Sequence, residues 1–264
     1  MSVFKRILYL LSELFTQVVT SPVLIRSSFF NSFYVWTYFK IKKILERDEF
    51  EYFLATVKPG MTVFDIGANI GFFTIEFSQL VGPKGKVYAF EPDPFIFSLL
   101  KKNIERRNLQ NVILHNIAVS DKEGHLDFFV NNKNRADNRV YSSPNEHRTK
   151  IVVDAKSIDS IVPADVKVNF IKIDIQGYEL FALKGMSKII SNSGNCILFS
   201  EFWPYGMQLC GYKGTEYLDE LIASRFQIKY EDDTQILEEK NFKTFTESFP
   251  MNDFGYTNLI CKKL

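Results

Sequence analysis

The residues best suited to chemistry begin at Asp65, an acidic residue in a short apolar run of β-strand character. Gly67 and Gly71 follow in a tight turn, where glycine lets the backbone approach a ligand and leaves the amides of the next helix free. A second apolar run ends at Glu91, 20 residues beyond Gly71. Its carboxylate can accept two hydrogen bonds from ribose hydroxyls. Together these features predict a nucleoside-binding site at the carboxyl edge of a parallel sheet.

The glycine spacing argues against a dinucleotide site. That fingerprint needs three glycines in the order G-x-G-x-x-G. Here Asn69 occupies the place of the second glycine, and Gly71 comes one residue early. A nicotinamide-dependent oxidoreductase is therefore a disfavoured alternative. A further alternative is that the glycines only form a tight turn between a strand and a helix and bind no ligand.

The elements that position these residues follow from the hydrophobic pattern. Apolar runs of strand length alternate with stretches whose apolar residues recur about every three or four positions, as in amphipathic helices. This order predicts a doubly wound, mostly parallel α/β sheet. The strands are expected at 63–65, 87–90, 112–114, 168–173, 197–200, 226–230 and 257–262.

A polar segment, Asn131–Lys150, interrupts this regular order. Strand-like runs, Leu126–Val130 and Ile151–Val153, flank it. We interpret the segment as a mobile loop over the site, with a solvated linker as an equal alternative.

The composition limits the class of protein. With 264 residues, 46% of them hydrophobic and 24% charged, the chain resembles an ordinary soluble globular protein. A net charge of +1 gives no case for a nucleic-acid partner. Cys196, Cys210 and Cys261 lack the spacing of metal ligands, which favours free thiols and a cytoplasmic location.

Residues 1–48 form an apolar, aromatic extension, expected to be helical on both sides of Ser21-Pro22. Its longest uncharged runs, 14–25 and 27–39, hold 12 and 13 residues, fewer than the ~20 that span a bilayer. The extension is predicted to cap the main domain, 49–264; peripheral contact with a membrane or an acceptor is the alternative.

Several separated motifs resemble the FkbM family of S-adenosylmethionine-dependent methyltransferases, largely O-methyltransferases of sugars and polyketide-type products. The matching stretches are Val63–Gly71, Ala89–Pro92, Asn116–Asp121, Ile171–Glu179 with Leu183–Gly185, and Thr257–Ile260, within roughly 50–264. The resemblance implies the seven-stranded, Rossmann-like sheet of class I methyltransferases with an antiparallel last strand. Gln176 departs from the family, which usually carries Glu there, so its consequence for a metal or for proton transfer stays open.

The resemblance also implies a role for each matching residue. Around S-adenosyl-L-methionine, Glu91 would bind the ribose. The methionine part would contact Asp65, Gly67, Ala68, Asn69 and Gly71, and the remaining contacts would come from Pro92, Asn116, Ile117 and Asp174. Methyl transfer to a hydroxyl needs a group that takes its proton. Asp174 and Glu201 end adjacent predicted strands and are the first candidates, with Glu179 as the third.

The expected acceptor is a hydroxyl on a glycan or another small molecule, and the aromatic run 202–205 could stack on a sugar or belong to the core. A non-catalytic methyltransferase-like binding module is the alternative that Gln176 keeps open. The identity of the acceptor, metal dependence and the oligomeric state are not defined by the sequence.

Overall fold

The structure is a computed structural model that describes residues 39–131, 135–142, 147–230, 234–252 and 255–264. The expected helices around Ser21-Pro22 lie outside the described residues. Within these ranges, none of the helices combines the length and the apolar character needed to cross a membrane. The predicted boundary between 1–48 and 49–264 falls within α3 (Arg47–Thr56), and this division stays a prediction.

The main sheet has the strand order β10-β9-β11-β8-β7-β1-β2-β3. The five strands from β8 to β3 run parallel, and β11 is antiparallel to both β8 and β9. This confirms the doubly wound sheet with an antiparallel last strand; the short β10 adds an eighth strand at the edge. The bounds are β1 Thr62–Ile66, β2 Lys86–Phe90, β3 Val112–His115, β7 Phe170–Ile173, β8 Ile197–Phe202, β9 Phe226–Tyr230, β10 Gln235–Ile236 and β11 Thr257–Lys263.

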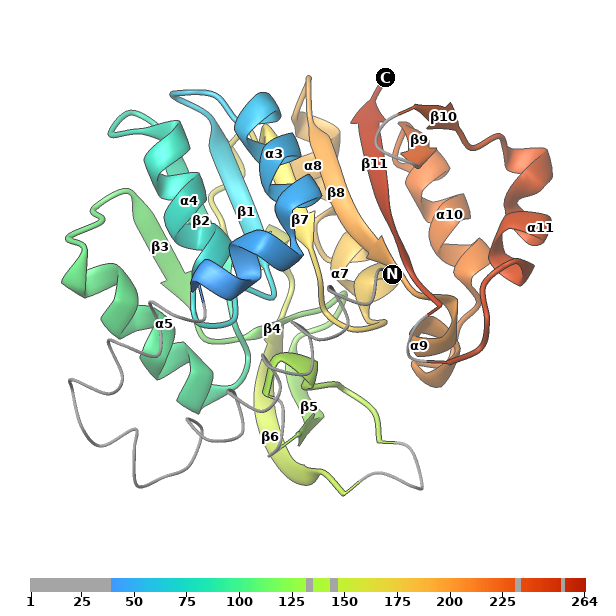
Figure 1. Ribbon diagram of the computed structural model, residues 1–264, viewed down its shortest axis with the longest axis horizontal. Coiled ribbons are helices and arrows are strands. Elements are labelled where there is room, and N and C mark those ends of the chain that lie inside the picture. Colours follow the sequence, from blue (N-terminus) through green and yellow to red (C-terminus); the bar gives the residue numbers. More distant parts are fainter. Residues whose placement is uncertain (1–38, 132–134, 143–146, 231–233, 253–254) are drawn as a thin grey trace.

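Helices cover both faces of this sheet, with α4 in front and α7 and α8 behind in Figure 1. The reason is the side-chain alternation of strands. Val63 of β1 and Phe170 of β7 pack with aromatic residues of α3 and α4, whereas their neighbours Phe64 and Ile171 pack with α7, α8 and α10. The helices are α3 Arg47–Thr56, α4 Phe72–Val81, α5 Pro94–Arg106, α6 Ile158–Ile161, α7 Glu179–Lys184, α8 Ser187–Asn192, α9 Pro204–Leu209, α10 Gly214–Ala223 and α11 Phe242–Glu247, with short 3₁₀ turns at Arg135–Asp137 and Glu239–Asn241.

Phe53 of α3 is the centre of the front aromatic layer. Its ring lies 4.9–5.5 Å, centroid to centroid, from the rings of four other phenylalanines, Phe73, Phe77, Phe170 and Phe199. The layer therefore joins α3 and α4 to the central strands. Residues 39–45 are also helical, and Phe39 packs against Phe72 with 5.1 Å between the ring centroids.

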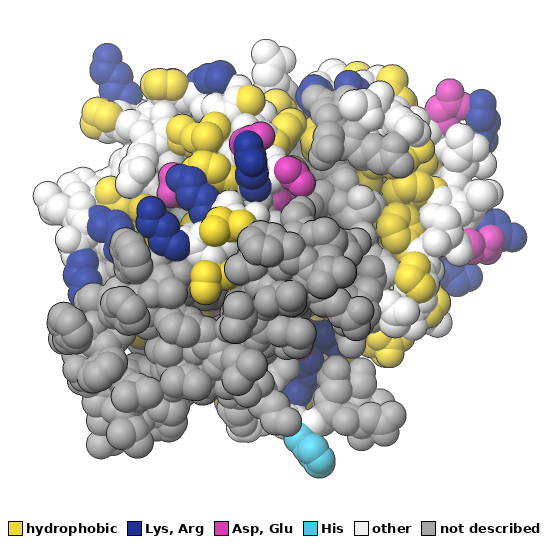
Figure 2. Space-filling view, in the orientation of Figure 1, with side chains coloured by type: hydrophobic (Ala, Val, Ile, Leu, Met, Phe, Trp, Pro, Cys, Tyr) yellow, Lys and Arg dark blue, Asp and Glu magenta, His cyan; other side chains and the backbone are white. Residues whose placement is uncertain are grey.

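A second, three-stranded sheet lies below the main one in Figure 1, in the order β4-β6-β5. It contains β4 (Ala118–Val119), β5 (Gly124–Val130) and β6 (Thr149–Lys156), with β5 and β6 antiparallel. The strands expected on both sides of the polar segment are thereby confirmed. On the face shown in Figure 2, basic and acidic side chains are intermingled with apolar ones, which agrees with the near-neutral charge of +1.

Candidate active site

The strand register places the predicted site residues in one row. Ile66 of β1 is level with Phe90 of β2 and Ile173 of β7, and Ile173 is level with Ser200 of β8. The residues that follow these four positions are Gly67, Glu91, Asp174 and Glu201. They therefore share the carboxyl edge of the sheet, where open α/β sheets bind their ligands.

The loop after β1 uses the left-handed region of backbone space three times. The φ angles are +81° at Gly67, +50° at Asn69 and +92° at Gly71. Asparagine tolerates this region, which explains how Asn69 stands where the dinucleotide motif has glycine. A Cβ atom at Gly67 would lie 2.0 Å from the backbone oxygen of Asp174, so this glycine permits the close approach of two protein segments.

Glu91 is buried at the end of β2, and both of its carboxylate oxygens face the loop region. Oε2 accepts from the backbone N–H of Asn69 and Oε1 from that of Asp93, both at 2.9 Å. Burial raises the pKa of Glu91 to about 8. Each oxygen has lone-pair capacity for a further hydrogen bond, so the carboxylate fits the vicinal hydroxyls of a ribose.

Asn116 joins the ends of β2 and β3. Its amide nitrogen donates to the backbone oxygens of Glu91 at 2.8 Å and of Pro92 at 3.1 Å. Ile117 packs in the core with Phe64 and other apolar side chains. The structure thus gives Asn116 a positioning contact beside Glu91, and the adenine contacts of Pro92, Asn116 and Ile117 stay predictions.

Lys172 is a buried cation that the sequence reasoning missed. Its Nζ lies 3.6 Å from Oδ1 of Asp65 and 3.5 Å from Oδ2 of Asp174. Asp65 is fully buried, and its Oδ2 accepts from Thr74 Oγ1 at 2.6 Å. The available signal was a lysine inside the otherwise apolar strand 170–173, since a buried charge requires a partner.

Gln176 connects the two carboxylates predicted to be catalytic. Its amide nitrogen donates to Oδ1 of Asp174 at 3.1 Å and to Oε2 of Glu201 at 3.2 Å. Gln176 has φ +58°, and the next residue, Gly177, has φ +97°. The unusual backbone of this turn therefore directs the amide between β7 and β8.

The two carboxyl groups have opposite pKa shifts. Burial acts to raise the pKa of Asp174, but the charges of Lys172 and Lys42 and the Gln176 hydrogen bond hold it below its ordinary value. Burial, followed by the negative charges of Asp174 and Glu179, raises the pKa of Glu201 well above its usual range. When neighbouring groups shift the pKa values of two carboxyls in opposite directions, the one with the low pKa stays ionised and the one with the high pKa can carry a proton. Here these are Asp174 and Glu201.

Glu179, the first residue of α7, follows the turn that carries Gln176 and is fully buried. Its Oε1 accepts from the backbone N–H groups of Ile175 and Gly177, both at 3.2 Å. Burial raises the pKa of Glu179 to about 7. The contacts give Glu179 a structural function in shaping the turn, and its direct participation in catalysis stays a prediction.

The described part of the polar segment before β6 contacts residues near both Glu91 and Glu201, the two ends of the row of site residues. Arg135 and Asn138 donate to Oδ2 of Asp93, at 2.9 and 3.0 Å. Arg139 lies with its guanidinium 4.8 Å from the ring centre of Trp203. Trp203 is itself buried and donates to the backbone, so the core alternative for this residue is confirmed. This part of the segment is therefore held by specific contacts.

The edge is suited to a positively charged nucleoside ligand. The carboxyl groups of Asp65, Glu91, Asp174 and Glu201 share it with the ammonium group of Lys172. S-adenosyl-L-methionine carries a sulfonium and an amino group against one carboxylate, so the negative charge of Asp174, whose pKa is held below its ordinary value, favours it. Among the described residues no cluster of three His, Cys, Asp or Glu side chains could hold a metal ion.

The strand order, the antiparallel last strand and the acid-glycine loop define a class I methyltransferase. The Methyltransferase FkbM domain matches residues 65–244, more than half of the chain. The chain belongs to the FkbM methyltransferase family and uses S-adenosyl-L-methionine as its methyl donor.

Relatives of several activities share parts of this sequence. The 31-O-demethyl-FK506 methyltransferase FkbM of Streptomyces tacrolimicus is 43% identical over 68 residues, covering 26% of this chain and 25% of that protein. The hexuronic acid methyltransferase AglP of Haloferax volcanii is 27% identical over 56% of this chain and 59% of its own. A probable cobalt-precorrin-6B C(15)-methyltransferase of Sulfurisphaera tokodaii is 30% identical over 50% of this chain and 72% of its own.

A solved structure of similar architecture is the methyltransferase FkbM from Methylobacillus flagellatus KT. It is 18% identical, with a TM-score of 0.48, and the match covers 85% of this chain and 53% of that one. This chain thus spans about half of that protein's length.

Proposed function

We propose that this protein transfers the methyl group of S-adenosyl-L-methionine to a hydroxyl oxygen of a glycan or another hydroxylated small molecule. The observation that carries the proposal is the Asp174–Gln176–Glu201 bridge, level with the cofactor loop at one sheet edge. Two of the relatives named above, FkbM and AglP, act on a demethylated FK506 and on a hexuronic acid by their names.

The cofactor contacts follow the row from β1 to β3. The backbone of 67–71, with Asp65 beneath it, would hold the methionine part, and Glu91 would accept hydrogen bonds from the ribose. Pro92, Asn116 and Ile117 would border the adenine. When bound, S-adenosyl-L-methionine supplies an activated methyl group, so the protein has to align the acceptor and exclude water.

Glu201 is the group we assign to accept the proton of the hydroxyl. A hydroxyl is a poor nucleophile until it loses its proton, and only the ionised form of a carboxyl group can take that proton. The raised pKa of Glu201 makes its ionised form a stronger base than that of Asp174, so the rate of methyl transfer should increase as the pH rises and Glu201 ionises. Asp174, held ionised by Lys172, is a weaker base and supplies negative charge beside the cofactor. As the oxygen forms its bond to the methyl carbon, the proton passes to Glu201 and then to solvent. This reverses the order expected from the sequence, in which Asp174 was the first candidate.

The test is single-turnover transfer of labelled methyl groups to a panel of hexoses, hexuronic acids and methyl glycosides. We expect Glu201→Gln to lower the rate about 10²–10⁴-fold, the range for a lost general base. Asp174→Asn should also lower it, and both variants should keep their affinity for S-adenosylhomocysteine within about threefold. An undiminished rate in Glu201→Gln would remove its assignment as the base.

The same experiment separates the competing functions. Binding of S-adenosylhomocysteine without transfer to any member of the panel would support the non-catalytic module. The name of the Sulfurisphaera tokodaii relative suggests methyl transfer to carbon for that enzyme. Such a transfer here would give a product that is stable to ether cleavage. The family assignment sets aside the nicotinamide-dependent oxidoreductase.

A further inference from the structure

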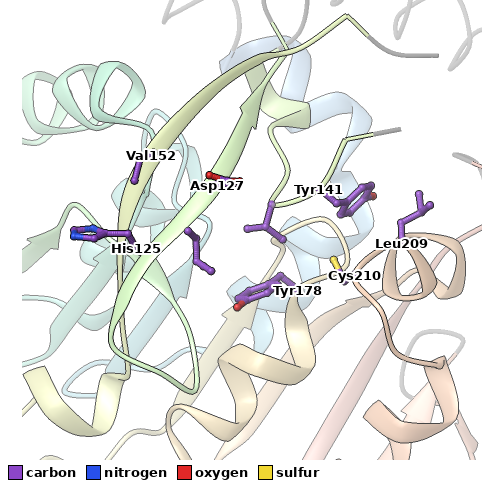
Figure 3. A pocket seen from close by; sticks show the side chains of 9 residues that line it. His125, Asp127, Tyr141, Val152, Tyr178, Leu209 and Cys210 are labelled. Atoms are coloured by element: carbon purple, nitrogen blue, oxygen red, sulfur yellow. The ribbon is translucent and has the colours of Figure 1, made fainter. Parts of the chain in front are cut away.

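A pocket of 470 Å³ lies between the small sheet and α9, and Tyr178, from the turn after β7, is part of its lining (Figure 3). In Figure 3, Tyr141, Leu209 and Cys210 form one side, His125 and Val152 lie across from them, and Tyr178 stands between. The lining residues are His125, Leu126, Asp127, Val140, Tyr141, Val152, Tyr178, Leu209 and Cys210. Neither Asp174 nor Glu201 belongs to this set, so the pocket does not contain the predicted reaction centre.

The pocket is connected to the reaction centre through one turn. Tyr178 follows Gly177 directly, and a Cβ atom at Gly177 would lie 2.5 Å from the backbone of Gly206 in α9. The turn that carries Gln176 therefore packs directly on the helix that precedes Cys210. A molecule in the pocket would contact Tyr178, which lies two residues after Gln176 in the chain.

The lining has two tyrosines, whose hydroxyls differ in their contacts. The Tyr178 hydroxyl lies 3.1 Å from Ser120 Oγ, within hydrogen-bond distance. Tyr141 is 8% exposed, and its hydroxyl has no hydrogen-bond partner among the described residues. A buried hydroxyl without a partner is unfavourable, which points to a ligand group that completes it. Burial raises the pKa of the Tyr141 hydroxyl far above its ordinary value, so it stays protonated and can donate.

Other lining residues limit the chemistry. Burial also raises the pKa of the Cys210 thiol, which makes this side chain a small apolar group and no nucleophile. Leu209, Val140 and Val152 are apolar. His125 and Asp127 bring polar groups to the strand side, where they also contact Asp154 at 3.0 Å and Lys150 at 2.7 Å. A saccharide ring matches this mixture, because its C–H face packs on aromatic and aliphatic groups while its hydroxyls need hydrogen bonds.

We infer that this pocket is a subsite for a sugar ring that is not methylated, and that the acceptor therefore contains at least two linked rings. This inference rests on the proposed function. The methylated ring would lie at Asp174 and Glu201, and its neighbour would pack against Tyr178 and Tyr141. Binding energy from such a remote ring raises kcat/KM for the longer acceptor.

Val152→Trp is the variant that tests the subsite. Val152 is 62% exposed on β6, so a larger side chain there can enter the pocket without disturbing the core. Ile236→Trp is the matched control, since Ile236 is 53% exposed on β10, in the main sheet. Tyr141→Phe removes the hydroxyl that has no partner and leaves the ring.

The probes are methyl hexosides and the corresponding disaccharides, measured by NMR saturation transfer with S-adenosylhomocysteine bound and by methyl transfer. We expect the wild type and Ile236→Trp to favour disaccharides at least about tenfold in kcat/KM and in binding. Val152→Trp should remove this preference while S-adenosylhomocysteine affinity is kept, and Tyr141→Phe should reduce it. The inference is overturned if Val152→Trp keeps the preference, or if the wild type shows none.

The two failures are distinguishable. If disaccharides bind in the pocket but no methyl group is transferred, the proposed function fails and the binding part of the inference stands. If methyl transfer occurs equally to single and linked rings, the function stands and the subsite is wrong.

Discussion

Gln176→Glu tests the bridge between the two carboxylates most directly. In the wild type its amide nitrogen donates to Asp174 at 3.1 Å and to Glu201 at 3.2 Å. Glutamate has nearly the same shape, but it would place a third acidic oxygen where these two hydrogen bonds originate. We expect the variant to be close to the wild type in stability at acidic pH and to lose stability as the pH rises.

The size of the loss follows from these distances. Two unit charges about 3 Å apart repel by about 5 kcal/mol at an effective dielectric constant of about 20, and by about 1 kcal/mol in water. The Asp174 side chain is 40% exposed, so solvent screening brings the repulsion between Asp174 and the new glutamate closer to the value in water. The hydrogen bond lost to Asp174, whose pKa is held low, removes about 1.5–3 kcal/mol more.

Protonation of the new carboxyl limits the loss and makes it depend on pH. Keeping it neutral costs about 1.4 kcal/mol for each pH unit above its unfolded pKa of about 4.3, or about 1 kcal/mol at pH 5 and about 4 kcal/mol at pH 7. Its pKa is raised in the folded state, so the folded protein binds the extra proton. Stability is therefore highest below the unfolded pKa and falls as the pH rises toward the folded pKa.

The assay is thermal unfolding of both proteins from about pH 5 to about pH 8, where about 1 kcal/mol corresponds to about 2–4 °C in Tm. Gln208→Glu is the matched control, because Gln208 is exposed on α9 and should show no pH-dependent difference. The double variant Gln176→Glu, Glu201→Gln exchanges the amide and the acid and should recover most of the loss. A difference in Tm that is the same at every pH would refute the reasoning.

Three further predictions concern the cofactor loop, the ribose acid and the aromatic layer. Gly67→Val should abolish S-adenosylhomocysteine binding, because its Cβ atom would lie 2.0 Å from the Asp174 oxygen; unchanged affinity by calorimetry, in a folded variant, would contradict this. With the Glu91 pKa at about 8, and the ionised form the better acceptor, affinity should rise with pH by up to about tenfold per unit below pH 8. Glu91→Gln should bind with no such slope, and equal slopes would disprove the role. Phe53→Ala should lower the free energy of unfolding, measured by urea titration, by about 3–5 kcal/mol. Leu54→Ala is the control and should cost under about 1 kcal/mol, because Leu54 is 43% exposed on the same helix. Similar losses in the two variants would be evidence against the stabilising role of the aromatic layer.

Much of this site could be predicted from local sequence pattern. Gly67, Glu91, Asp174 and Glu201 each stand at or next to the end of an apolar run, and parallel strands bring such ends to one edge. The hydrophobic pattern also predicted both strands beside the polar segment. A strand is recognised from the order of apolar and polar residues along the chain, so no long-range contact is needed to predict it.

The contacts that tune the site could not be predicted in the same way. The Gln176 bridge requires the β7–β8 register and a left-handed backbone at a residue that rarely adopts it. The position of Lys172 between Asp65 and Asp174 depends on β1 lying beside β7, strands far apart in the sequence. Gly67 was expected to admit a ligand, which stays a prediction; its close packing on the Asp174 backbone is a further constraint that the sequence did not reveal. Each of these features is a long-range contact that no single stretch of sequence contains.

The contact between Gly177 and Gly206 gives the two walls of the pocket unequal freedom to change. The wall formed by α9 packs backbone to backbone against the turn that carries Gln176, so we expect changes in α9 to disturb the hydrogen bonds of Gln176 to the carboxylates. The wall formed by β5 and β6 belongs to a separate sheet, and Val152 on it is exposed to solvent. If the pocket binds the acceptor as we infer, substitutions on the strand wall are the ones expected to change the choice of acceptor with the least effect on the carboxylates.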